Sequence, residues 1–183
     1  IYGANASGKS YILHALSALK TAVSDVFEKD YEYAWYEPFR LSKNSIGKPT
    51  EINIKMIIDE TIYDYTLSYV SNRITHESLY HYPPGKNRSR IFERDGDKNT
   101  IIGGSKDIFD RTSTSSAYLT LGSKYNDPVC DKVRGFIKNI IIVGPNCTNL
   151  VGNTFDRAEK NSEFKKALLN ALYVADFGIS DFG

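Results

Sequence analysis

The sequence is poor in the residues that form covalent or metal cross-links. Among its 183 residues are only two cysteines, Cys130 and Cys147, and they form no C-x-x-C pair. Without paired thiols a disulfide framework is excluded, and we expect reduced structural thiols in a cytoplasmic protein. The three histidines are scattered along the chain and lack the spacing of metal ligands.

Long hydrophobic runs and a strong charge imbalance are missing too. No apolar run approaches the roughly 20 residues that span a membrane, and the first residues do not resemble a signal peptide. The net charge of +1 provides no global attraction to nucleic acid, although it leaves room for a local basic patch. With 41% hydrophobic and 25% charged residues, the composition is typical of a soluble globular chain.

The chemistry is concentrated in the first ten residues. Gly3, Gly8, Lys9 and Ser10 satisfy G-x-x-x-x-G-K-[ST], the phosphate-binding loop of nucleoside triphosphatases. The glycines let the backbone approach a polyphosphate closely, so that its N–H groups form a nest for the anion. The predicted nucleotide-binding residues are Gly3, Ala4, Asn5, Ala6, Ser7, Gly8, Lys9 and Ser10.

Two side chains of the loop have specific predicted roles. We expect the Lys9 ammonium to stabilise the β- and γ-phosphates, and the Ser10 hydroxyl to complete the coordination of Mg²⁺. The motif therefore predicts a nucleoside triphosphate and Mg²⁺ as cofactors. Ile1–Tyr2 predicts the end of a strand, and apolar residues at 12, 16, 19 and 23 predict a helix from Lys9 to about Phe27. Strand, loop and helix in this order are the context that the motif requires.

The middle of the chain changes to a period of two, which is typical of half-buried strands. Turn residues such as Asp59–Thr61 and Asp95–Gly96 separate the alternating segments. We predict an antiparallel meander inserted after the first helix, with strands at 51–58, 63–69, 74–82, 89–94 and 100–102.

The remainder reads as mostly helical. We predict a short helix at 131–139, a core strand in the apolar run 140–143, and a helix capped at Asn161–Ser162 that ends near Asp176. Residues 115–125 are ambiguous. The predicted division is 1–50 for the loop and first helix, 51–102 for the β subdomain, and 103–183 for a mostly helical part of the head.

Two alternatives compete with a simple ATP-binding reading. Met56–Glu60 resembles the apolar run ending in Asp-Glu that holds Mg²⁺ in P-loop enzymes, so Asp59 is a candidate acid for a self-contained kinase or GTPase. The strict alternation before Asp59 instead favours a hairpin turn. No N-K-x-D segment for guanine recognition is present.

The second alternative is a nucleic-acid-binding module. The chain has 13 tyrosines, and Lys86, Arg88, Arg90 and Arg94 lie on the predicted meander among several of them. Aromatic rings between cations can stack on and grip nucleic acid. A sheet whose exposed face is covered by tyrosines, next to a solvated basic turn, explains the same pattern.

Several stretches together resemble a family of prokaryotic ATPases described as "AAA domain, putative AbiEii toxin, type IV toxin–antitoxin system", in the ABC-type, SMC/RecF/OLD-like branch of P-loop proteins. The similar stretches are 1–10, 38–41, 51–54, 63–65, 77–80, 91–94 and 171–181. The resemblance implies an α/β fold, namely a partial P-loop NTPase head of the ABC type with an antiparallel β subdomain.

The resemblance also implies which partners the protein has and where its remaining catalytic residues lie. ATP would be clamped with Mg²⁺ between two heads of a homodimer, beside a nuclease or other effector, in anti-phage defence or DNA transactions. The chain has no glutamine and no L-S-G-G-Q signature. We therefore expect the signature serine, the Walker B acid and the catalytic glutamate to lie beyond Gly183, and this segment to be part of a larger ATPase.

Overall fold

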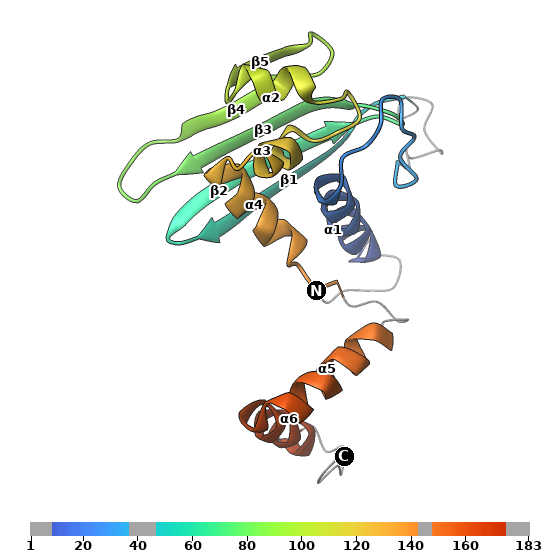
Figure 1. Ribbon diagram of the computed structural model, residues 1–183, viewed down its shortest axis with the longest axis vertical. Coiled ribbons are helices and arrows are strands. Elements are labelled where there is room, and N and C mark those ends of the chain that lie inside the picture. The colour runs from blue at the N-terminus through green and yellow to red at the C-terminus, as the bar shows by residue number, and fades with distance from the viewer. Residues whose placement is uncertain (1–8, 37–46, 143–147, 175–183) are drawn as a thin grey trace. The chain divides into compact units, whose positions relative to one another are not determined.

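The computed structural model describes residues 9–36, 47–142 and 148–174 (Figure 1). They belong to two compact units, residues 1–140 and 141–183, which are described separately below. Within the described ranges, every helix is too short or too polar to cross a bilayer.

The first unit is built on a five-stranded antiparallel sheet with its strands in chain order. The strands are β1 (Thr50–Ile58), β2 (Thr61–Tyr69), β3 (Ile74–Tyr82), β4 (Ser89–Asp95) and β5 (Thr100–Gly103). The predicted meander is therefore confirmed. Asp59 and Glu60 connect β1 to β2 with φ angles of 48° and 61°, and two such positive values are typical of a tight hairpin turn.

The two faces of the sheet differ in character because directly paired residues point to the same side. The inner face is mostly apolar but also carries the buried charges of Glu77 and Arg94. Its buried apolar members include Ile52, Met56, Tyr63, Tyr65, Leu67, Leu79 and Phe92. The outer face carries the alternate residues, which are mostly polar or charged. This alternation explains why the sequence pattern predicted the strands well.

Among the described residues of this unit, four helices accompany the sheet. They are α1 (Lys9–Ser24), α2 (Lys106–Arg111), α3 (Tyr118–Lys124) and α4 (Pro128–Lys138). Figure 1 shows α1, α3 and α4 on one side of the sheet. The first helix is confirmed, although it ends three residues before Phe27. The helix α4 begins earlier than predicted because the Asp127 carboxylate accepts hydrogen bonds from the N–H groups of Val129 and Cys130, with Pro128 at the first position.

A buried carboxylate fastens α3 to the inner face. The residue before this helix, Ala117, has no side chain that could cap it. Glu77 of β3 instead accepts hydrogen bonds from the N–H groups of Tyr118 and Leu119, at 2.7 and 2.9 Å. The ambiguous segment 115–125 is therefore helical over most of its length because a residue about 40 positions earlier satisfies the start of the helix.

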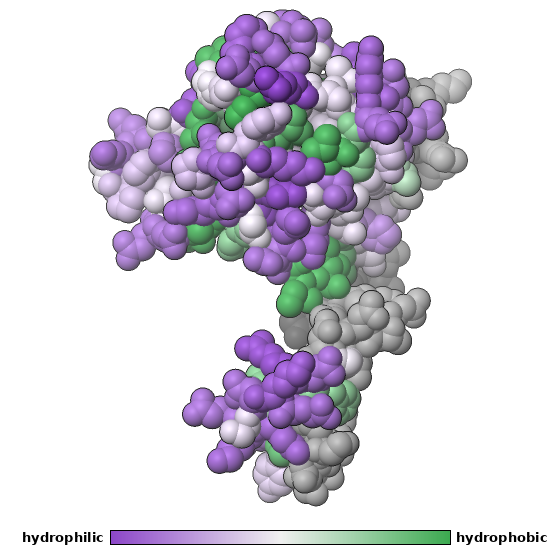
Figure 2. Space-filling view, in the orientation of Figure 1, coloured by the Kyte–Doolittle hydropathy of each residue, from purple (hydrophilic) through white to green (hydrophobic). Residues whose placement is uncertain are grey.

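The predicted core strand at 140–143 is wrong over its described part. Residues 140–142 have no regular structure, and Ile141 is 69% exposed. The Ile140 carbonyl accepts a hydrogen bond from Lys20 Nζ of α1 at 2.8 Å, where a strand would have accepted one from a neighbouring strand's N–H group. Figure 2 shows apolar surface around the segment that follows α4. Val143 lies outside the described residues.

The second unit contains α5 (Thr148–Lys160) and α6 (Ser162–Val174). The predicted cap of α6 is confirmed, since Asn161 Oδ1 accepts a hydrogen bond from the N–H of Phe164 at 3.0 Å. The guanidinium of Arg157 lies 4.6 Å from the centre of the Phe164 ring and joins the two helices. The helix α5 was not predicted.

Candidate nucleotide-binding site

The structure describes only the helical end of the predicted phosphate-binding loop. Gly3, Ala4, Asn5, Ala6, Ser7 and Gly8 lie outside the described residues. Lys9 is the first residue of α1, and Ser10 is the second and is exposed. The helix therefore begins at the Lys-Ser pair of the motif, as the motif's context requires.

The start of α1 suits an anion. A helix leaves its first N–H groups without partners inside the helix, and its dipole places partial positive charge there. The first turn of α1 contains no acidic side chain that would neutralise this charge. An exposed hydroxyl at Ser10 is a suitable oxygen ligand for Mg²⁺. The residues present thus fit a magnesium-bound polyphosphate.

The opposite end of α1 is firmly held. Leu19 and Val23 are fully buried in the core. Arg134 of α4 donates from Nε to the Val23 carbonyl at 2.8 Å and from Nη2 to the Ser24 carbonyl at 2.6 Å, and Thr120 Oγ1 donates to the Val23 carbonyl at 3.0 Å. A cation at a helix C-terminus satisfies unpaired carbonyls and complements the dipole. The far end of α1 is therefore clamped.

Sequence reasoning missed Arg134. Its only signal is a basic residue on an amphipathic helix, and nothing in the sequence connects it to a helix about 110 residues earlier. The clamp matters for the candidate site because it fixes the axis of α1, and with it the direction in which the N-terminal N–H groups point.

The N-terminal half of α1 is exposed within the described structure. Tyr11, Ile12 and Leu13 are 74%, 47% and 40% exposed. Only the later members of the predicted apolar stripe, Leu19 and Val23, are in the core. The site is thus carried by a helix that is buried at its C-terminal half and open at the end where the loop joins it.

Asp59 is a turn residue. It follows β1, an edge strand of the described sheet that runs antiparallel to β2, whereas the Mg²⁺-holding acid of P-loop enzymes follows a buried strand. Its side chain is 75% exposed and pairs with Lys132 Nζ at 2.9 Å. This carboxylate raises the pKa of Lys132 through their hydrogen bond. The turn interpretation is confirmed.

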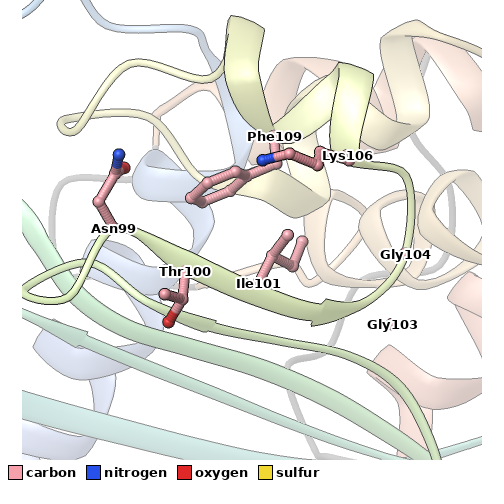
Figure 3. A pocket seen from close by; sticks show the side chains of 7 residues that line it. All are labelled: Asn99, Thr100, Ile101, Gly103, Gly104, Lys106 and Phe109. Carbon is pink, nitrogen blue, oxygen red and sulfur yellow. The ribbon is translucent and has the colours of Figure 1, made fainter.

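A small cavity of about 290 Å³ lies between β5 and α2 (Figure 3). It is lined by Asn99, Thr100, Ile101, Gly103, Gly104, Lys106 and Phe109. The Lys106 ammonium lies 6.0 Å from the centre of the Phe109 ring and 3.4 Å from Asp110 Oδ1, so its charge already has a partner. None of these residues belongs to the predicted site, and we assign this cavity no ligand.

The part of the chain that the structure describes contains neither a metal-binding cluster of His, Cys, Asp or Glu side chains nor a reactive thiol. The described residues contain no group of three or more such side chains placed to hold a metal ion. Cys130 is buried beside α3, and burial raises the pKa of its thiol far above the usual value. A thiol that stays protonated is a poor nucleophile, so Cys130 is a core residue.

Comparison with known proteins places most of the chain in one sequence family. The family described as "AAA domain, putative AbiEii toxin, Type IV TA system" matches residues 1–119. This span covers the predicted loop, α1, the whole sheet and α2, and it ends inside α3. No curated protein and no solved structure matches the chain.

Proposed function

The chain belongs to this AAA domain family, and from that premise we propose that it is the ATP-binding part of an ABC-type P-loop ATPase head. Membership itself indicates a nucleotide-binding, ATPase-like function. The observation that carries the finer proposal is that α1 begins at Lys9, with an exposed Ser10 and no acidic side chain in its first turn. We propose Gly3–Ser10 as the binding loop.

Each part of the proposed site has a distinct role. The loop N–H groups and Lys9 hold the phosphate charge, and Ser10 supplies an oxygen to the metal ion. The clamp by Arg134 at the other end of α1 keeps these groups oriented. Bound Mg²⁺-ATP supplies a phosphoanhydride bond whose cleavage releases free energy for a conformational change.

We further propose that two heads dimerise with Mg²⁺-ATP held between them. An effector such as a nuclease would work beside this head in anti-phage defence or DNA transactions. A self-contained kinase or GTPase using Asp59 is not proposed because Asp59 lies in an exposed turn.

Equilibrium binding of a fluorescent ATP analogue in the presence of Mg²⁺ tests the proposal. Lys9→Ala should weaken binding by about tenfold or more, because a charge-assisted contact to phosphate is lost. Lys124→Ala is the matched control, since Lys124 is exposed on α3. Equal affinity of the Lys9→Ala variant and the control would refute the site. Sedimentation with and without Mg²⁺-ATP tests the dimer.

A further inference from the structure

An apolar row crosses three strands on the outer face of the sheet, at the end that carries the β1–β2 hairpin. Ile57 pairs with Ile62, and Ile62 pairs with Tyr82, so the three side chains point to the same side. Ile57 is 68% exposed and Ile62 is 39% exposed. We call these three residues the apolar row.

A charged row runs beside it. Lys55 pairs with Asp64, Asp64 with Tyr80, and Tyr80 with Arg90. Arg88, just before β4, lies with its guanidinium 3.6 Å from the centre of the Tyr80 ring. Residues two apart on a strand are separated by about 6.8 Å, so the two rows are parallel at roughly that distance. We call Lys55, Arg88 and Arg90 the basic row.

The carboxylates of this surface lie beneath the cations. Asp64 is only 8% exposed, and one of its oxygens is 3.7 Å from Lys55 Nζ and 3.9 Å from Arg88 Nη2. Glu93 is 34% exposed, lies 3.6 Å from Arg90 Nε and accepts a hydrogen bond from the Tyr80 hydroxyl. The cations themselves are 61%, 50% and 39% exposed. The acidic groups therefore hold the cations in place while leaving their outer sides to solvent.

The cations of the basic row are more exposed than the carboxylates that pair with them, although Asp59 and Glu60 add exposed carboxylates at the adjoining β1–β2 hairpin. The basic row has three cations above two more deeply placed carboxylates, and exposed Lys86 adds a fourth in the adjoining loop. Because the side chains are already paired and stacked, little rotamer entropy is left to lose on binding. The surface is therefore prepared for a partner that carries regularly spaced negative charge.

We propose that these two rows bind single-stranded nucleic acid, with phosphates along the basic row and bases against the apolar row. Non-specific single-strand sites combine a cationic track with aromatic surface on which bases stack. The basic row crosses three strand spacings from β1 to β4, about 14 Å, and the apolar row crosses two, about 10 Å, which accommodates a few nucleotides. A duplex hides its bases and leaves the apolar row unfilled, so it fits less well. This surface is separate from the start of α1.

Fluorescence anisotropy of a 20-nucleotide oligothymidine at several salt concentrations tests the proposal. The logarithm of the binding constant should fall against the logarithm of salt with a slope no steeper than about −3, at roughly −0.7 for each phosphate contact. Arg88→Ala and Arg90→Ala should each weaken binding and make the slope shallower by about 0.7. Tyr82→Ala should weaken binding about fivefold or more with the slope unchanged, because it removes stacking and no charge.

Lys124→Ala, which removes an exposed cation from α3, should bind like the wild-type chain. If Arg88→Ala fails to fold by circular dichroism, Lys55→Glu replaces it, since Lys55 is more exposed. The proposal is overturned if the wild-type chain does not bind the oligonucleotide at low salt, or if Lys124→Ala weakens binding as much as Arg88→Ala. Equal affinity for a 20-base-pair duplex, or stronger binding to anionic lipid vesicles, also overturns it. ATP-analogue binding should be unchanged in Arg88→Ala, which separates this test from that of the nucleotide site.

Discussion

Replacing Glu77 by glutamine should remove a large part of the first unit's stability. The Glu77 side chain is fully buried and accepts three hydrogen bonds, from the Tyr65 hydroxyl at 2.9 Å and from the N–H groups of Tyr118 and Leu119. Arg94 Nη1 lies 3.9 Å away and is itself almost fully buried. A glutamine of the same volume keeps one acceptor oxygen and turns an amide donor toward a backbone donor.

The magnitude follows from the two groups that lose their partner. One N–H at the start of α3 is left unsatisfied, which costs about 1–3 kcal/mol when buried. Arg94 loses its only carboxylate neighbour among the described ion pairs, and breaking a buried charge pair costs about 3–5 kcal/mol. The two terms overlap, so we expect about 3–5 kcal/mol in total. For a chain of this length that lowers Tm by about 6–20 °C.

Urea unfolding followed by tryptophan fluorescence measures this loss. Trp35 is the single tryptophan and lies in the first unit, so its emission reports on the unit that contains Glu77. Glu93→Gln is the control: Glu93 pairs with Arg90 at the surface, where such a change costs about 1 kcal/mol or less. A loss for Glu77→Gln no larger than that of the control would refute the capping role.

Four further substitutions test the packing and the titration of the first unit. Gly122→Ala should destabilise the first unit by about 1–3 kcal/mol in urea unfolding, because the new Cβ would lie 2.6 Å from the Cys130 sulfur. At Gly135 a new Cβ would meet no atom within 4 Å, so Gly135→Ala should stabilise the unit by up to about 1 kcal/mol in the same assay. Arg134→Met should cost about 1–3 kcal/mol by the same assay, since the Ser24 carbonyl loses its side-chain donor and the Val23 carbonyl keeps only that of Thr120. Burial raises the pKa of Tyr69 to about 12, so the contribution of its protonated hydroxyl to the free energy of unfolding is complete below pH 10 and is lost as the pH rises toward 12. Tyr69→Phe should therefore reduce the loss of stability at alkaline pH by about 1–2 kcal/mol. An unchanged dependence of stability on pH would contradict this.

The sheet could be predicted from the sequence because its determinants are local. Alternation along each strand and the turn at Asp59–Glu60 lie within a few residues of the structure they specify. The helix α3 could not be predicted in this way. Its start is satisfied by Glu77 on a distant strand, and only the fold brings the two together. The same holds for residues 140–142, whose apolar composition fits a strand but whose Ile140 carbonyl is bound by Lys20.

In the candidate site, too, the features that depend on neighbouring residues could be predicted and the contacts between distant residues could not. The motif from Gly3 to Ser10 is readable from residue types alone, because each fixed position answers a requirement of phosphate binding. The hydrogen bonds that hold the C-terminal end of α1 could not be predicted from the sequence, since Arg134 and Ser24 are 110 residues apart. The apolar row and the basic row could be predicted only in part. Their cations and tyrosines stand out in the sequence, but the register is needed to show that Ile57, Ile62 and Tyr82 form a row.

Amide hydrogen exchange with and without Mg²⁺-ATP tests the central claim most directly, namely that the loop leading into α1 binds the nucleotide's phosphates. We expect slower exchange in peptides covering residues 3–13 with Mg²⁺-ATP, a much smaller effect with Mg²⁺-AMP, and no effect in the Lys9→Ala variant. Because α1 is anchored at its far end by Arg134, its C-terminal half should change little. Unchanged exchange at 3–13, or protection confined to other segments such as 99–109, would contradict the account.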